Sequence, residues 1–326
     1  MSWNELSERI LADGEATAAD ALAVLESPDD ELVEVLLAAY RLRYAHHGRE
    51  VRIHVLQNAK SGLCPEDCGF CSQSVRNASP VPSYQMQSVE ELVAGAREAH
   101  RRGAVKYCMV TSTRGPSTRD LDVVCAATRQ IKAEMDIKIC TSLGLLAEGQ
   151  AERLAEAGVD RFNHNLESSR AFYPGICSTH TFDDRIATVQ RAKAAGMEAC
   201  CGGIIGMGET LEDRVALALE LRALEVESIP VNFLDPRPET PLAGRTPPSP
   251  EDCLRALAMM RFVNPTRDIR VAGGREVSLG ALQALALLPA NSMFVNGYLT
   301  TPGAGWEADL AMIEEAGFTV ASLVAA

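Results

Sequence analysis

The sequence predicts a (β/α)8 barrel of the TIM type, preceded by a short helical extension. From residue 51 onward, short β-branched or apolar runs alternate with amphipathic stretches of helical period, a rhythm typical of βα units in a parallel sheet. Eight such units favour a closed barrel. The alternation of strands and helices does not by itself show closure, so an open doubly wound sheet is the alternative. The chain of 326 residues, 47% of them hydrophobic, is long enough for one large core.

The elements are expected in a fixed order. Apolar residues at helical spacing predict short helices within an N-terminal extension over residues 1–47. The barrel is expected over 48–320 and a C-terminal tail over 321–326. Its strands are expected near 52–57, 105–111, 137–142, 159–164, 198–205, 228–233, 268–272 and 292–296. Its helices are expected at 89–102, 117–134, 148–157, 182–195, 210–224, 250–262, 276–287 and 307–316. The Pro-rich stretch 236–250 is interpreted as a loop.

Composition and charge argue against several classes of function. A net charge of −13 disfavours nucleic acid and anionic membranes as partners. No apolar run is long enough to predict a transmembrane helix, and the polar, acidic N-terminus does not resemble a signal peptide. Ten cysteines without such a signal indicate a reducing cytoplasm, where thiols serve metals or catalysis rather than disulfides.

Three of these cysteines follow the first predicted strand with the spacing C-x3-C-x2-C: Cys64, Cys68 and Cys71. Thiolates suit zinc or iron–sulfur clusters, and a closed zinc site or an electron-transfer cluster normally takes four protein ligands. Three thiolates would leave one iron of a four-iron cluster free for S-adenosylmethionine (SAM), and the loop, with Phe70 before its last cysteine, resembles the radical SAM signature. The alternative is a zinc knuckle completed by a remote His or Cys. The motif lies on the first βα loop, where barrel active sites are found.

Further cysteines and one arginine lie in the middle of different predicted strands: Cys108, Cys140, Cys200 and Arg270. Because strand residues alternate in direction, all four side chains can converge inside the barrel. A buried cysteine taken singly is often only a small hydrophobe, but a buried guanidinium needs an acceptor. Cys200 is favoured over the adjacent Cys201, although a bulge would reverse that choice. The remaining cysteines are interpreted as structural: Cys125, Cys177 and Cys253.

Together these residues resemble the biotin synthase family over residues 40–320. The similar segments are 58–74, 163–168, 200–210, 230–234, 270–276 and 299–302. Two departures stand out. Cys201 occupies a position where many members carry serine, and the run 272–275 replaces a more usual Ser-Ala-Gly-Arg. The second should be tolerated because Arg270 is retained, and Arg275 is expected to pair with a neighbouring carboxylate.

The resemblance implies two clusters and a reaction. A [4Fe–4S] cluster that binds SAM would be held by Cys64, Cys68 and Cys71. A [2Fe–2S] cluster that donates sulfur would be held by Cys108, Cys140, Cys200 and Arg270. The implied activity is that of a sulfurtransferase of the radical SAM type, which converts dethiobiotin to biotin. The cofactors carry this chemistry, so no side chain is assigned as a general base.

The resemblance also implies contacts with SAM and with the ureido ring of dethiobiotin. Asn163 and Asn165 lie two residues apart at the end of the fourth strand and should face the same way, with capping of the next loop as the alternative. Glu167 is an implied acceptor. Gly203 and Gly206 belong to a glycine-rich run that would let the backbone approach the adenosyl group.

Partners follow from the same resemblance: dethiobiotin as a small-molecule substrate, a second copy of the chain in a homodimer, and an electron donor such as flavodoxin or ferredoxin. Two other functions stay open. One is another biotin-synthase-like radical SAM enzyme, such as a maturase or mutase, although those relatives generally lack the full inner set of three cysteines and one arginine. The other is a non-catalytic iron–sulfur or zinc protein, which predicts a cysteine-complete site.

Overall fold

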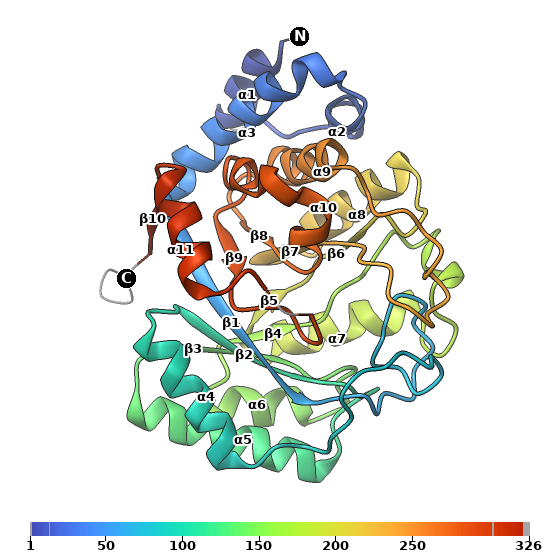
Figure 1. Ribbon diagram of the computed structural model, residues 1–326, viewed down its shortest axis with the longest axis vertical. Coiled ribbons are helices and arrows are strands. Elements are labelled where there is room, and N and C mark those ends of the chain that lie inside the picture. The colour runs from blue at the N-terminus through green and yellow to red at the C-terminus, as the bar shows by residue number, and fades with distance from the viewer. Residues whose placement is uncertain (1, 13, 302, 322–326) are drawn as a thin grey trace.

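The computed structural model describes residues 2–12, 14–301 and 303–321, and over this part of the chain a parallel sheet closes into a barrel (Figure 1). Closure comes from the pairing of the last barrel strand, β9, with the first, β1. The barrel strands are β1 (Glu50–Lys60), β2 (Lys106–Thr111), β3 (Lys138–Ser142), β4 (Arg161–Asn163), β5 (Glu198–Cys200), β6 (Gly203–Ile205), β7 (Ser228–Phe233), β8 (Asp268–Val271) and β9 (Ser292–Phe294). The predicted (β/α)8 barrel is therefore confirmed, and the open sheet is excluded.

Helices surround the barrel at the expected places. They are α4 (Val89–Arg101), α5 (Thr118–Glu134), α6 (Gln150–Ala157), α7 (Phe182–Ala194), α8 (Leu211–Ala223), α9 (Pro250–Val263), α10 (Arg275–Leu279) and α11 (Trp306–Glu315). Helices α4, α5, α7, α8 and α9 each begin after a Ser or Thr whose hydroxyl accepts a hydrogen bond from the third helical N–H, which satisfies one of the free donors of the first turn. The Pro-rich stretch forms the loop between β7 and α9, as predicted.

The N-terminal helices pack on the outside of this ring. They are α1 (Trp3–Leu11), α2 (Ala18–Leu25) and α3 (Leu32–His47), and they lie against α8 and α9 (Figure 1). Arg43 of α3 is fully buried, and its guanidinium donates to the carbonyl oxygens of Ala290 (3.2 Å) and Glu50 (2.7 Å). The extension is thus tied to the barrel by polar contacts as well as by apolar packing. Of the expected tail 321–326, only Ala321 lies within the described residues.

Three elements differ from the prediction. The short strand β10 (Thr319–Val320), which pairs with the start of β1, was not expected. The strand expected over 198–205 is divided into β5 and β6, because the chain between them passes close to β7: a Cβ on Gly202 would lie 1.9 Å from the carbonyl oxygen of Pro230. The helix expected over 276–287 is a short α-helix, α10, followed by a 3-10 segment, Gly280–Leu287. Gly280 has a φ of 50°, which interrupts the α-helical path.

Candidate active site

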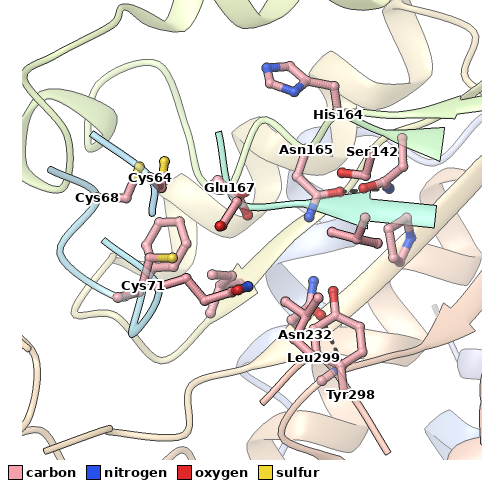
Figure 2. A pocket seen from close by; sticks show the side chains of 18 of the residues that line it. Cys64, Cys68, Cys71, Ser142, His164, Asn165, Glu167, Asn232, Tyr298 and Leu299 are labelled. Atoms are coloured by element: carbon pink, nitrogen blue, oxygen red, sulfur yellow. Dashed lines mark hydrogen bonds between the residues drawn. The ribbon is translucent and has the colours of Figure 1, made fainter. Parts of the chain in front are cut away.

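A cavity of about 290 Å³ opens among the strands and the loops that follow them. In Figure 2, Cys64, Cys68 and Cys71 lie toward one side, Asn165, Asn232 and Tyr298 toward the other, and Glu167 between them. The lining includes every residue of both predicted metal-binding sets: Cys64, Cys68, Cys71, Cys108, Cys140, Cys200 and Arg270. The fold therefore brings two groups of thiols, predicted from different parts of the sequence, to one chamber.

The first-loop cysteines are held by a compact turn. The Cys71 N–H donates to the Cys68 carbonyl (3.0 Å), and the Cys64 N–H donates to the carbonyl of Gln73 (3.2 Å). Burial raises the pKa of the Cys64 thiol to about 11 and also raises that of Cys71. In this environment a bound metal is what deprotonates the thiols. Three soft donors beside a cavity fit an iron–sulfur cluster that keeps one iron open.

The inner quartet, defined as Cys108, Cys140, Cys200 and Arg270, is buried inside the barrel, with exposed fractions of 4%, 3%, 1% and 1%. Cys108 and Cys140 face each other across the β2–β3 pair. Cys200 is the last residue of β5, and its sulfur lies 3.3 Å from Nη1 of Arg270 on β8. The described residues that line the cavity include Cys200 but not Cys201. Three thiols and a guanidinium thus converge from four strands.

Arg270 has one N–H group without a hydrogen-bond partner in the part of the chain that the structure describes. Its Nη2 donates to Ser228 Oγ (2.7 Å) and to Asp268 Oδ2 (3.1 Å), and its guanidinium carbon lies 5.1 Å from the centre of the Phe294 ring. Its buried Nε has no hydrogen-bond partner among the described residues. A buried N–H without an acceptor is costly, so this donor fits an anionic group bound in the cavity that Arg270 lines.

Asp268 forms ion pairs with two buried arginines at the base of the quartet. Its Oδ2 lies 3.1 Å from Arg161 Nη1 as well as from Arg270 Nη2, and its Oδ1 accepts from Ser292 Oγ at 2.5 Å. Burial by itself would raise the pKa of Asp268, but Arg270 and Arg161 hold that pKa well below its usual value. The carboxylate is therefore ionised and fixes the orientation of Arg270.

Asp268→Asn is expected to lower the free energy of unfolding by about 3–5 kcal/mol, because it leaves the buried Arg270 guanidinium without its carboxylate. Arg161 loses one of two carboxylates and keeps Glu198, which lies 2.7 Å from its Nη2. Urea unfolding of the full chain measures this loss. Asp183→Asn is the control: it breaks a surface pair with Arg170, and with its side chain 75% exposed it should cost no more than about 1 kcal/mol. A carboxyl group whose pKa is lower in the folded chain than in the unfolded chain stabilises the fold at pH values above its unfolded pKa of about 3.9. The difference between wild type and Asp268→Asn should therefore shrink as the pH falls through the folded-state pKa, and equal stabilities of the two proteins near neutral pH would contradict the assignment.

The predicted cofactor contacts divide into two groups. Asn163, Asn165 and Glu167 line the cavity, and burial raises the pKa of Glu167 although Arg185 opposes this. Asn163 Nδ2 lies 3.2 Å from Cys200 Sγ, and Asn165 Oδ1 accepts from the Gly202 N–H (3.1 Å). Gly203 and Gly206 are not among the described lining residues. Packing requires glycine at both positions. A Cβ on Gly203 would lie 2.6 Å from the Glu167 carbonyl oxygen, and a Cβ on Gly206 would lie 2.7 Å from Pro248.

Sequence reasoning missed Arg185, which lies on α7 and is buried in this chamber. Its Nη1 donates to the Asn165 carbonyl (2.7 Å), its Nε donates to the Tyr173 hydroxyl (2.6 Å), and its Nη2 lies 4.0 Å from Cys68 Sγ. An arginine on an amphipathic helix gives no sequence signal that distinguishes it from a surface residue. Its position beside the first-loop thiols is set by tertiary packing alone.

Cys177 was interpreted as structural together with Cys125 and Cys253, but its surroundings differ from theirs. Cys125 and Cys253 lie in helices, with their sulfurs 3.6 Å and 4.0 Å from backbone carbonyls. The sulfur of Cys177 instead lies 3.8 Å from that of Cys68 and 3.3 Å from Nδ1 of His180. The short spacing Cys177-x2-His180 was a readable signal, but 109 residues separate Cys177 from Cys68. The prediction for Arg275 is confirmed, because its Nη2 lies 2.6 Å from Asp309 Oδ1.

Comparisons with known proteins agree with this geometry. The radical SAM superfamily domain matches residues 59–221, and the biotin and thiamin synthesis associated domain matches residues 230–319. Biotin synthase of Salinibacter ruber is 55% identical over 97% of this chain and 88% of its own length. Biotin synthase of Geobacillus kaustophilus is 50% identical over 98% of this chain and 96% of its own length. The chain belongs to the biotin synthase family.

Membership of the biotin synthase family makes the chain a radical SAM enzyme and implies SAM and a [4Fe–4S] cluster as cofactors. The non-catalytic alternative is thereby set aside. Solved structures support the fold: methylornithine synthase has a TM-score of 0.86 at 19% identity, covering 98% of both chains. The hydrogenase maturase HydG of Carboxydothermus hydrogenoformans has a TM-score of 0.83 at 16% identity, covering 98% of this chain and 79% of its own. In the described part of the chain, none of the helices is long and apolar enough to cross a membrane.

Proposed function

We propose that the chain inserts sulfur into dethiobiotin to form biotin, as the name of its relatives indicates. The observation that carries the proposal is the inner quartet, in which three buried thiols meet a guanidinium with a spare N–H donor. Another biotin-synthase-like radical SAM enzyme would need a cluster at the first loop but has no evident use for this second set. The quartet therefore favours a reaction that consumes inorganic sulfide.

The proposed cofactor sites follow the sequence predictions. Cys64, Cys68 and Cys71 would hold the [4Fe–4S] cluster. Cys108, Cys140, Cys200 and Arg270 would hold the [2Fe–2S] cluster. When bound, these groups supply the electron that cleaves SAM and the sulfur that is inserted.

The side chains that line the cavity would bind and orient SAM and dethiobiotin and would exclude water. Arg185 is a buried cation beside Cys68 and suits the carboxylate of SAM. Asn163 and Asn165 offer amide groups for the polar parts of SAM and of the ureido ring, and Glu167 offers an acceptor whose Oε2 is buried and unpaired among the described residues. Apolar walls from Leu56, Val110 and Phe294 keep water and competing hydrogen donors away from the reacting carbon.

Further proposals concern partners and organisation. The chain would act as a homodimer in the cytoplasm and would take electrons from a flavodoxin or a ferredoxin. The helical extension over residues 1–47 and the barrel over 48–320 would form one folding unit, since buried Arg43 joins them. Gly203 and Gly206 remain proposed SAM-contacting positions through their backbone.

Anaerobic reconstitution of the full chain with iron and sulfide tests the function. The expected iron content is about six atoms per chain, four from one cluster and two from the other. With SAM, dethiobiotin and a one-electron reductant, release of 5′-deoxyadenosine and formation of biotin should both be detected by mass spectrometry. About four iron atoms per chain, with 5′-deoxyadenosine but no biotin, would favour a different radical SAM reaction.

A further inference from the structure

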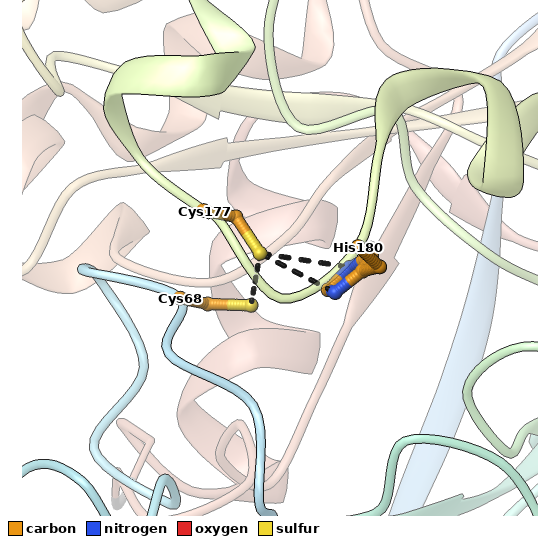
Figure 3. A group of neighbouring side chains, drawn as sticks. All are labelled: Cys68, Cys177 and His180. Atoms are coloured by element: carbon orange, nitrogen blue, oxygen red, sulfur yellow. Dashed lines mark hydrogen bonds between the residues drawn. The ribbon is translucent and has the colours of Figure 1, made fainter.

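A compact group of metal-binding side chains lies where the first loop meets the loop before α7. It consists of Cys68, Cys177 and His180, which Figure 3 shows facing one another. The three are buried, and their potential ligand atoms all lie within 4.8 Å of one another. We define this group as the Cys2His cluster. It shares Cys68 with the first-loop triad, but Cys177 and His180 have no place in either proposed iron–sulfur site.

The spacing of the cluster matches that of a tetrahedral metal ion. Zn–S bonds of about 2.3 Å and Zn–N bonds of about 2.0–2.1 Å, at a tetrahedral angle, place two sulfurs about 3.8 Å apart and a sulfur and a nitrogen about 3.6 Å apart. The sulfurs of Cys68 and Cys177 are 3.8 Å apart. The sulfur of Cys177 lies 3.3 Å from Nδ1 and 3.9 Å from Nε2 of His180. The Cys68–Cys177 and Cys177–His180 separations are therefore close to those of ligands on one tetrahedral ion, and the third pair lies within 4.8 Å.

A carboxylate orients the histidine. Glu66 Oε2 lies 2.5 Å from His180 Nδ1, and it also accepts from Thr179 Oγ1 at 2.6 Å. Metal-binding histidines usually donate one ring N–H to a carboxylate and ligate through the other nitrogen. Here that arrangement assigns Nε2 to the metal. Glu66 and His180 are both buried, so the pair is held away from competing water.

The loop that carries the cluster is fixed to the first loop at a second point. Asp67 Oδ1 accepts from the backbone N–H groups of Ser178 (3.0 Å) and Thr179 (3.2 Å). The Gly69 N–H donates to the carbonyl of Ile176 at 2.8 Å. These contacts hold Cys177 next to Cys68 without help from a bound ion, so the site is preorganised.

We propose that the cluster-free chain binds one divalent transition-metal ion of the zinc type through Cys68 Sγ, Cys177 Sγ and His180 Nε2. The two thiols release their protons to solvent on binding, and the resulting thiolates balance the charge of the ion. A fourth position remains for water or a carboxylate oxygen. If the proposed function holds, Cys68 also belongs to the [4Fe–4S] site, so the ion and the cluster exclude each other.

Titration with Co²⁺ tests the cation site directly. The cluster-free full chain, kept anaerobic with a phosphine reductant and without SAM, should bind one Co²⁺ and develop thiolate-to-cobalt and tetrahedral ligand-field absorption. His180→Gln and Cys177→Ala should each weaken binding by at least about 100-fold, more than the loss of an outer partner. Cys253→Ala is the matched control and should leave binding unchanged. The double variant Cys64→Ala/Cys71→Ala should still bind.

Binding that survives in Cys177→Ala and His180→Gln but disappears in the Cys64→Ala/Cys71→Ala variant would overturn the proposal, because the first-loop triad would then hold the ion. Competition is tested separately, by absorbance during reconstitution. Zinc added first should slow [4Fe–4S] assembly in the wild type and much less in His180→Gln, and equal rates with and without zinc in the wild type would overturn the mutual exclusion. Neither measurement uses dethiobiotin, so failure here is distinguishable from failure of the biotin assay.

Discussion

Replacing Cys108 with alanine is expected to reduce biotin formation by at least about 100-fold while SAM cleavage remains measurable. The reason is that the two steps would depend on two different cofactors, and Cys108 would hold only the one that donates sulfur. Cys108 faces Cys140 across the β2–β3 pair and is 4% exposed. Its loss would remove one of the four proposed ligands of the sulfur-donating cluster. The first loop, which follows β1, would be unchanged. The measurement is mass spectrometry of 5′-deoxyadenosine and biotin from the reconstituted variant.

Cys125→Ala provides the control for this result. Cys125 is also a buried thiol, but it lies on α5, and its sulfur lies 3.6 Å from the carbonyl oxygen of Arg153. This variant should form biotin like the wild type, apart from a stability loss that thermal unfolding would reveal. Full biotin formation in Cys108→Ala would show that the inner quartet does not hold the sulfur source. Loss of biotin in both variants would point to a general effect of removing a buried thiol.

Replacing Cys71 with alanine is expected to abolish both products. Cys71 is one of only three thiols proposed for the SAM-binding cluster, and its N–H to Cys68 carbonyl bond shows how tightly the turn is built (3.0 Å). With two thiolates left, the cluster loses a ligand that no other cysteine of the loop can replace. Iron content should fall to about two atoms per chain, while the absorption of the inner cluster persists.

The outcome that would contradict this second prediction is specific. Release of 5′-deoxyadenosine at the wild-type rate from Cys71→Ala would mean that another residue, such as Cys177, supplies the third thiolate. The double variant Cys71→Ala/Cys177→Ala separates these explanations. If Cys177 is the substitute, only the double variant loses SAM cleavage. If the triad is as proposed, the single variant has already lost it.

Much of the fold was readable from the sequence because it is encoded locally. The alternation of strand and helix patterns predicted the order of the barrel strands and helices, since each element depends on periodicity within a few residues. The spacing of Cys64, Cys68 and Cys71 predicted a three-thiol site because all three lie on one short loop. Strand alternation also predicted that Cys108, Cys140, Cys200 and Arg270 could meet, and in the structure all four line one cavity.

What the sequence left undetermined depends on contacts between distant residues. Barrel closure requires β9 to pair with β1. The division of β5 from β6 arises where Gly202 passes the carbonyl of Pro230. The neighbours of Cys68, namely Arg185, Cys177 and His180, come from a loop and a helix more than a hundred residues further along the chain. Periodicity fixes the direction in which a side chain leaves its own element, whereas only the packing of one element against another fixes what that side chain meets.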